Sequence, residues 1–409
     1  MLGNVIVGQS GGPTAVINSS LAGVYKTAKD LGANKVYGMR HGIHGFLEEN
    51  IVDLDTKIKS DLDLELLKRT PSAFLGSCRF KLPEASDDKA MYEKIFEILK
   101  KYEISAFFYI GGNDSMDTIK KLSDYAADID SPIRFIGVPK TIDNDLEVTD
   151  HTPGFGSAAK YIASVTKEII RDGLVYDIKN VTIIEIMGRN AGWLTGAAAL
   201  ATCEDCEGVD GIYLPEVAFD IDKFVEKVGK LLETKSAIVM AVSEGIKTAD
   251  GKYVFEHGAH NEYVDAFGHK QLSGTAKYLA DLVSEKFGCK SRAIELSTMQ
   301  RCAGHLTSRV DITEAYQVGG SAVKAAFDGE TGMMVTLKRE SSDPYICTTG
   351  LYDVHKIANV EKKVPLEWIT EDGTFVSKEM VNYIKPLIQA ELTPIMITGQ
   401  PRHIVIDMQ

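Results

Sequence analysis

Along the chain, short runs of apolar residues alternate with longer stretches in which apolar side chains recur every three or four positions. The short runs are rich in Val and Ile and are predicted to be buried strands, at residues 4–7, 106–110, 134–138, 181–186 and 237–242. The longer stretches are predicted to be amphipathic helices, at residues 14–31, 92–102 and 115–125. Strands and helices that alternate in this way predict an α/β protein with mostly parallel sheets.

Two later parts of the chain depart from this alternation. Residues 248–273 are polar, contain His257, His260 and His269, and are predicted to form an insertion between a strand and a later helix. Residues 377–391 are predicted to be a helix and residues 403–406 a strand. These segments extend the alternating pattern without repeating it.

The length of 409 residues exceeds what one hydrophobic core usually organises, so two lobes are expected. With 45 Lys and Arg against 58 Asp and Glu, the net charge of −13 argues against nucleic acid or an anionic membrane as a partner. A phosphate ligand would need local cations and backbone N–H groups that overcome this field. Each basic residue beside a glycine turn is therefore informative.

The chain has the features of a cytoplasmic protein. No apolar run approaches the roughly 20 residues of a membrane span, and the first residues lack the charged segment and long apolar stretch of a secretory signal. The six cysteines are therefore interpreted as reduced thiols. Cys203 and Cys206 form a C-x-x-C pair, but no second pair follows at zinc-site spacing, so a metal or redox role is the weaker interpretation.

Two glycine turns follow predicted strands, at the ends where parallel sheets bind ligands. Residues 11–12, GG, follow the first strand and are predicted to open a helix, so their N–H groups and the helix dipole offer an anion site. A tight turn is the alternative, and no Gly-Lys-Ser/Thr follows to make a P-loop.

Residues 111–115, GGNDS, form a second glycine turn after a predicted strand. Asp114 there either holds a metal ion or repels a ligand charge, unless it caps the helix, as Ser115 could.

Residues 140–145, KTIDND, are the most informative stretch. Two carboxylates one residue apart could form a solvated turn, since Asp and Asn favour turns. Here a lysine and a threonine stand beside them, at the same predicted sheet edge as the glycine turns. Phosphoryl transfer to a hydroxyl needs a carboxylate that takes the hydroxyl proton, a second that holds Mg²⁺, and a cation at the equatorial oxygens. The stretch therefore predicts phosphoryl transfer.

Further polar and cationic groups lie near later strand ends: Arg189, Glu244, Arg292 and Arg301. Each of them alone could be part of a surface ion pair. The arginines also suit a sugar phosphate, because the guanidinium fork binds phosphate oxygens in pairs.

In their order along the chain, these motifs resemble those of the 6-phosphofructokinase family. The resemblance runs from about residue 3 to residue 355 and rests on Gly11-Gly12, LGSCR at 75–79, GGNDS at 111–115, PKTIDND at 139–145, MGR at 187–189 and MQR at 299–301. It implies two doubly wound, Rossmann-like domains with the active site in the cleft between them. It also implies reversible phosphorylation of fructose 6-phosphate at its 1-hydroxyl, with Mg²⁺ as cofactor.

The resemblance assigns a donor-binding domain to residues 1–154 with about 300–350, and a sugar-phosphate-binding domain to 155–299 with about 351–409. Asp143 would be the general base, Lys140 would stabilise the transition state, and Asp145 would help to hold magnesium, with Asn113 and Asp114 as further metal candidates. Donor phosphates would meet Gly11, Gly12, Arg79 and Lys140. The sugar phosphate would contact Thr141, Ile142, Asp143, Met187, Gly188, Arg189, Glu244, Arg292, Thr298 and Arg301, with Arg189 also catalytic and Arg292 reaching in from a neighbouring subunit.

The choice of donor depends on Asp114. Relatives that use ATP usually carry glycine at its position, whereas relatives that use pyrophosphate carry Asp there and Lys at the position of Lys140. A carboxylate about 4 Å from the α-phosphate of ATP costs roughly 4 kcal/mol at an effective dielectric near 20, about a thousandfold in affinity. Lys140 alone decides little, because some ATP users also carry it. The pyrophosphate-dependent branch is therefore predicted, and ATP is the alternative.

Three positions depart from the family pattern. Asn113 stands where most relatives have a metal-associated Asp, and Thr298 replaces the usual His or Tyr. Asn180 occupies the position of an arginine that many bacterial members contribute across a subunit interface, so a homodimer is favoured over a tetramer. Two alternatives stay open: a non-catalytic regulatory subunit, against which the retained Asp143 argues, and the use of sedoheptulose 7-phosphate through the same contacts.

Overall fold

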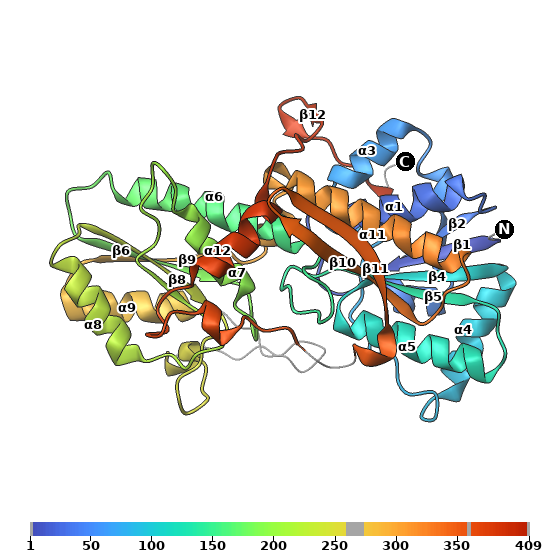
Figure 1. Ribbon diagram of the computed structural model, residues 1–409, viewed down its shortest axis with the longest axis horizontal. Helices are drawn as coiled ribbons and strands as arrows, with labels where there is room; N and C mark the ends of the chain where they lie inside the picture. Colours follow the sequence, from blue (N-terminus) through green and yellow to red (C-terminus); the bar gives the residue numbers. More distant parts are fainter. Residues whose placement is uncertain (1–2, 259–273, 358–360, 407–409) are drawn as a thin grey trace.

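The computed structural model describes residues 3–258, 274–357 and 361–406, which form two α/β lobes side by side along the long axis of the molecule (Figure 1). Of the insertion predicted at 248–273, the part up to Gly258 lies within the described residues and holds a short 3-10 helix, Val254–His257. Residues 259–273, with His260 and His269, lie outside them.

The first lobe is built on a seven-stranded sheet in the order β11-β10-β5-β4-β1-β2-β3. Its strands are β1 (Asn4–Gln9), β2 (Val36–Met39), β3 (Ile51–Asp53), β4 (Ile104–Gly111), β5 (Arg134–Pro139), β10 (Met333–Ser342) and β11 (Tyr345–Asp353). The inner strands run parallel, and the edge strands β3 and β11 run antiparallel to their neighbours. Strands β1 and β4 are buried nearly throughout, because helices cover both faces of the sheet.

Helices form an outer layer on each face of this sheet. One layer contains α1 (Ile17–Asp30), α3 (Asp61–Arg69) and α11 (Arg309–Phe327), and the other contains α2 (Gly42–Leu47), α4 (Lys89–Lys101) and α5 (Asn113–Asp128). Helices α1 and α11 touch through their backbones: a Cβ atom at Gly23 would lie 2.1 Å from the carbonyl oxygen of Tyr316. This close approach joins parts of the chain that are far apart in sequence.

The second lobe has a four-stranded parallel sheet in the order β7-β8-β6-β9. Its strands are β6 (Asn180–Ile186), β7 (Gly211–Tyr213), β8 (Ala237–Ser243) and β9 (Lys290–Glu295). Helices α6 (Phe155–Gly173), α7 (Trp193–Gly196) and α12 (Lys378–Ile384) pack on one face, and α8 (Ile221–Leu232) and α9 (Thr275–Phe287) on the other. The short α10 (Met299–Cys302) lies between β9 and α11 in the chain. The predicted α/β class with two doubly wound lobes is confirmed.

The helices described here include none that is both long and apolar enough to cross a membrane.

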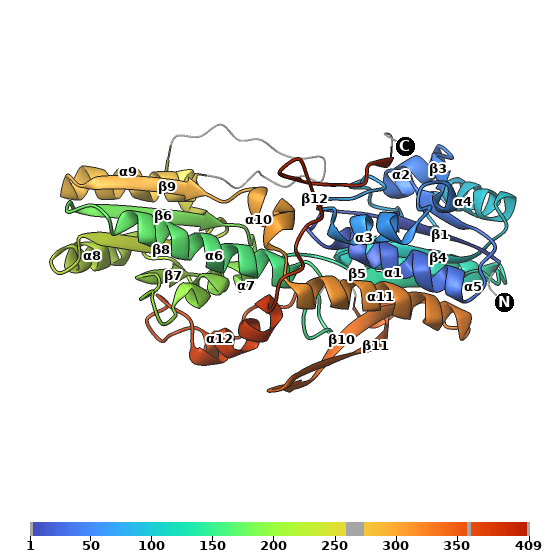
Figure 2. The same ribbon diagram turned by 90° about the horizontal axis from the view of Figure 1, so that it is seen from above.

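The segment after β11, called the tail from here on, contributes to both lobes. Val354 and Ile357 are buried in the core of the first lobe, and Met380 and Ile384 in that of the second. The chain then passes back over the junction, through the small hairpin β12 (Met396–Ile397) and β13 (Gln400–Pro401), to the first lobe (Figure 2). There Ile404 and Ile406 join the first core. The expected assignment of residues 351–409 to the second domain is therefore wrong at both ends of that range.

Two predicted elements of the tail differ from those observed. The helix predicted at 377–391 ends at Ile384 and continues only as a 3-10 turn, Lys385–Ile388, because Pro386 has no N–H to donate within the helix. The strand predicted at 403–406 is an extended segment that pairs with no strand among the described residues. Its Ile404 N–H donates instead to Thr70 Oγ1, at 3.1 Å.

Candidate active site

The turn after β1 lies against the loop at 75–79. The Gly11 N–H donates to the Cys78 carbonyl oxygen at 3.1 Å, and Ser77 Oγ donates to the Gly11 carbonyl oxygen at 2.6 Å. Gly11 has a φ of 74°, in the left-handed region that glycine adopts without strain. Helix α1 begins only at Ile17, so the prediction that a helix starts at Gly12 and contributes its dipole there is wrong. What remains for an anion at this turn is its backbone and the cations around it.

Two of those cations touch the turn directly. A Cβ atom at Gly11 would lie 3.2 Å from Lys140 Nζ, and one at Gly12 would lie 3.0 Å from Arg301 Nη1. Burial lowers the pKa of the Arg301 guanidinium, and the nearby charge of Arg79 lowers it further. Gly11, Gly12, Lys140, Arg79 and Arg301 are thus brought together from four separate segments.

Lys140 is the buried member of this group, with 3% of its surface exposed. Its Nζ donates to the Gly12 carbonyl oxygen at 2.8 Å. Burial lowers the pKa of Lys140 to about 8, against the attraction of Asp143 and Asp145 and with the repulsion of Arg301 and Arg79. The ammonium is therefore still mostly protonated at neutral pH and is held close to the glycine turn.

The loop after Lys140 presents Asp143. Thr141 Oγ1 accepts the Asp143 N–H at 3.1 Å, and Ile142 is buried in the core of the second lobe. Burial raises the pKa of Asp143, while Lys140, Thr141, Arg301 and Arg189 act in the opposite direction. Asp143 therefore lies where cations from the first lobe and from the loops beyond β6 and β9 converge.

The carboxyl ends of β6 and β8 form the other side of the site. Ser243 Oγ donates to the Gly188 carbonyl oxygen at 2.6 Å, and the Gly188 N–H donates to Glu244 Oε1 at 3.3 Å. Gly188 has a φ of 136°, and a Cβ atom there would lie 2.6 Å from the Ala191 carbonyl oxygen. Burial, together with the nearby charge of Asp143, raises the pKa of Glu244 to about 8. The Glu244 carboxyl group thus lies within electrostatic range of Asp143.

Sequence reasoning missed two residues that shape this side. Gln300 Oε1 accepts the Met187 N–H at 3.2 Å, and Gln300 Nε2 donates to the Ser297 carbonyl oxygen at 2.9 Å. Glu185 Oε2 accepts the Ala276 N–H at the start of α9, at 2.8 Å, and burial raises its pKa to about 7. Both had a signal: Gln300 stands inside the MQR motif, and Glu185 is a lone charge in an otherwise apolar strand.

The two remaining predicted sugar-phosphate residues, Arg292 and Thr298, lie in different surroundings. Arg292 pairs with Thr182 in the middle of β6, and its Nη1 donates to Asp172 Oδ2 on α6 at 3.3 Å. It lines a separate pocket of about 270 Å³ beside α6. Thr298 is exposed immediately before α10, and its carbonyl oxygen accepts the Arg301 N–H at 3.1 Å. The role predicted for Arg292, in which it reaches in from a neighbouring subunit, stays a prediction.

The candidate metal ligands suit a hard divalent cation. Burial raises the pKa of Asp145 to about 7, with Asp143 and Glu361 adding to the effect. Asn113 Oδ1 is buried and accepts no hydrogen bond from the described part of the chain, while Asp114 is exposed in the first turn of α5. Carboxylate and amide oxygens are the ligands that Mg²⁺ prefers, and its charge would favour the ionised form of Asp145.

Together these groups can bind an anionic substrate and accept a proton from it. The cations and backbone of the glycine turn can bind a polyanion, and the partly buried Asp143 can accept a proton beside them. Gly188, Glu244 and Gln300 add a preorganised polar surface on the opposite side.

Comparison with known proteins gives the same picture over almost the whole chain. The family model "Phosphofructokinase" matches residues 4–326. The pyrophosphate–fructose 6-phosphate 1-phosphotransferase of Methylococcus capsulatus is 38% identical, over 98% of this chain and 96% of its own length. The protein of the same name from Xanthomonas campestris is 41% identical, over 95% and 92%.

A solved structure described as the pyrophosphate-dependent phosphofructokinase of Nitrosospira multiformis superposes with a TM-score of 0.88. It is 37% identical, and the match covers 98% of this chain and 95% of that one. Family model, full-length relatives and fold agree, and the chain belongs to the phosphofructokinase family.

Proposed function

We propose that the protein transfers a phosphoryl group from pyrophosphate to the 1-hydroxyl of fructose 6-phosphate, giving fructose 1,6-bisphosphate and phosphate. The observation that carries this proposal is the contact of Lys140 with the Gly11-Gly12 turn, within electrostatic range of Asp143. The proposal is supported by full-length relatives at 38% and 41% identity whose names specify this donor and this sugar.

Each residue group has a distinct part in the reaction. Asp143 takes the proton of the 1-hydroxyl, and burial makes its carboxylate a stronger base than a solvated Asp. Lys140 and Arg79 stabilise the negative charge on the transferred group. A bound magnesium ion, held by Asp145 with Asn113 and Asp114, would neutralise donor oxygens. In the reverse direction the Asp143 carboxyl returns the proton to the sugar oxygen.

The first lobe would bind the donor and the second lobe the sugar phosphate. Thr141, Ile142, Met187, Gly188, Arg189 and Glu244 would contact the sugar, and Arg301 its 6-phosphate. Arg292 would reach the 6-phosphate of a neighbouring subunit's substrate, so the protein would work as a homo-oligomer. We place this activity in the cytoplasm.

Pyrophosphate is expected to be the better donor. Initial rates of the purified chain with fructose 6-phosphate and Mg²⁺, at equal concentrations of pyrophosphate and ATP, should favour pyrophosphate by at least about a hundredfold, because the Asp114 carboxylate repels an α-phosphate. Faster turnover with ATP would overturn the donor assignment. Turnover by the purified chain would exclude a purely regulatory subunit, and sedoheptulose 7-phosphate as acceptor tests the sugar.

Asp114→Gly is expected to improve the use of ATP by about 10- to 1000-fold in kcat/KM relative to pyrophosphate, because it removes one charge repulsion at the donor. Asp117→Gly, one helical turn away on α5, controls for loss of helix stability. It should not change the ratio of ATP to pyrophosphate rates. An unchanged ratio in Asp114→Gly would contradict the charge argument.

A further inference from the structure

The residue between the two carboxylates of the KTIDND loop has an unusual conformation. Asn144 has a φ of 55° and is fully buried. Its side chain is fastened at both ends: Oδ1 accepts the Thr152 N–H at 3.1 Å, and Nδ2 donates to the hydroxyl oxygen of Tyr383 at 2.9 Å. A non-glycine residue in this region persists only where its surroundings hold it there. Tyr383, on α12 of the tail, supplies one of those holds.

The tail contacts the same loop at further points. Glu361 forms an isolated antiparallel bridge with Leu146, and the Lys362 N–H donates to the Asp145 carbonyl oxygen at 2.8 Å. Lys362 Nζ donates to the Thr149 carbonyl oxygen at 3.1 Å and also to that of Asp150. The backbone on the C-terminal side of Asp145 is therefore bound to a segment more than two hundred residues later in the chain.

Tyr383 is itself held from several sides. Its hydroxyl donates to the Asp150 carbonyl oxygen at 2.6 Å, and its ring lies 5.2 Å from that of Trp193. The Arg339 guanidinium of β10 lies 4.6 Å from the ring centre, and its Nη1 donates to the Tyr383 carbonyl oxygen at 2.9 Å. Such a ring has little freedom to move, so its hydroxyl is a fixed reference point for Asn144.

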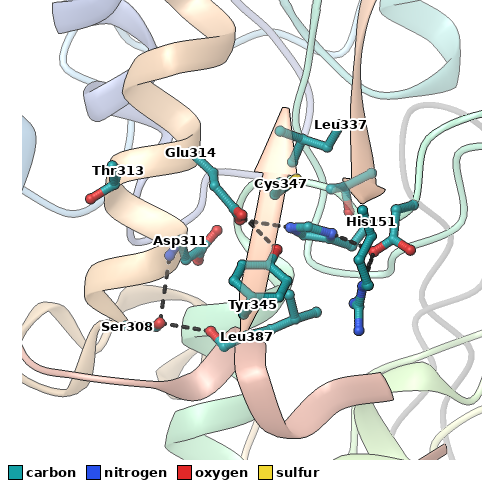
Figure 3. A network of polar contacts seen from close by, with 12 residues as sticks. His151, Ser308, Asp311, Thr313, Glu314, Leu337, Tyr345, Cys347 and Leu387 are labelled. Atoms are coloured by element: carbon teal, nitrogen blue, oxygen red, sulfur yellow. Dashed lines mark hydrogen bonds and ion pairs between the residues drawn. The ribbon is translucent and has the colours of Figure 1, made fainter. Parts of the chain in front are cut away.

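A buried ionic network holds Asp150, the residue whose carbonyl oxygen accepts from the Tyr383 hydroxyl (Figure 3). Asp150 Oδ1 accepts from Arg339 Nη2 at 2.9 Å and lies 2.8 Å from His151 Nδ1. His151 Nε2 lies 2.7 Å from Glu314 Oε2, and the Tyr345 hydroxyl donates to Glu314 Oε1 at 2.6 Å. The chain of contacts thus runs from α11 and β11 through Asp150 to Tyr383 and the loop.

We propose that Tyr383 and Lys362 are positioning residues for the catalytic carboxylates: the tail fixes Asn144 and the backbone at Asp145, and so sets how Asp143 and Asp145 face the reacting groups. This inference rests on the proposed function, since it takes Asp143 as the base. Tyr383 acts through Asn144 and is not itself a catalytic residue. An ordinary stabilising contact would lower the melting temperature and leave turnover unchanged.

Tyr383→Phe removes the hydroxyl and keeps the ring against Trp193 and Arg339. We expect kcat to fall about 10- to 100-fold, because small misplacements of a catalytic group cost this much. The KM values for fructose 6-phosphate and pyrophosphate should stay within about twofold. Tyr25→Phe is the matched control: it removes a hydroxyl that donates to Asp55 Oδ1 at 2.9 Å in the first lobe. Its kcat should stay within about twofold of the wild type.

A second pair of variants separates positioning from stability. Asn144→Gly accepts the same backbone φ and removes both contacts of the amide, so it should lose at least as much kcat as Tyr383→Phe. The double variant should lose no more than Asn144→Gly alone, because that change already removes the link to Tyr383 together with the contact to the Thr152 N–H. If Tyr383→Phe does not fold, Asn144→Gly alone decides: reduced kcat with unchanged KM supports the proposal, and wild-type kcat overturns it.

Equal melting-temperature losses in Tyr383→Phe and Tyr25→Phe, with wild-type kcat in both, would also overturn the positioning role. The proposed function is judged separately, by the wild-type chain with pyrophosphate. If the wild type proves to use ATP instead, the same variants are compared with ATP, and the positioning proposal is still decided.

Discussion

Asp143→Asn is expected to lower kcat by about 10²- to 10⁴-fold, the usual contribution of a general base. The amide has the shape of the carboxyl group but cannot take the proton of the 1-hydroxyl, so KM for fructose 6-phosphate should change little. Steady-state rates in the forward direction measure the loss. Because the same carboxyl returns the proton in reverse, the reverse rate should fall by a similar factor.

The control for Asp143→Asn is another buried carboxylate. Asp311 accepts the N–H groups of Gly154 and Ser157 at 2.8 Å each, and burial raises its pKa to about 6. Asp311→Asn should lower the melting temperature while kcat stays within a few-fold. A loss of less than tenfold in Asp143→Asn would assign the proton transfer to another group.

Lys140→Met is expected to lower kcat by about 10²- to 10³-fold, because a preorganised charge at the transferred group is lost while the aliphatic stem stays packed. The lowered pKa of Lys140, about 8, predicts in addition a characteristic pH dependence. In the free wild-type enzyme, kcat/KM should fall as pH rises through about 8, since the neutral amine no longer attracts the phosphates. That alkaline decline should be absent in Lys140→Met.

Lys160→Met provides the comparison for this second change. Lys160 is also buried, and its Nζ donates to the Ala390 carbonyl oxygen at 2.7 Å in the tail. Its replacement should affect thermal stability and leave the pH profile of kcat/KM unchanged. A retained alkaline decline in Lys140→Met would show that another group titrates.

Much of the fold could be predicted from local patterns. Strands such as β6 and β8 are short Val- and Ile-rich runs between polar turns, and their composition suffices to place them. The tail could not be placed in this way. Ile404 and Ile406 resemble a strand in sequence, but the buried hydroxyl of Thr70, more than three hundred residues earlier, takes the place of a strand partner.

The candidate site also has a part that local patterns predicted and a part that they could not. Motifs at strand ends predicted which loops would meet, since parallel strands place their carboxyl ends at one edge, and the loop after β5 does meet the turn after β1 at Lys140. The partners that hold those loops were not predictable. Gln300 binds the Met187 N–H and Tyr383 binds Asn144, and such contacts depend on three-dimensional packing that no local pattern encodes.

The contact between α1 and α11 affects how the protein folds during its synthesis on the ribosome. At about 5–20 residues per second, α11 is synthesised on the order of 15 to 60 s after α1. During that interval the backbone surface at Gly23, which the Tyr316 carbonyl later covers, has no native neighbour. Ile404 and Ile406 follow later still. The first half of the first lobe therefore lacks its packing partner α11 until more than three hundred residues have been synthesised.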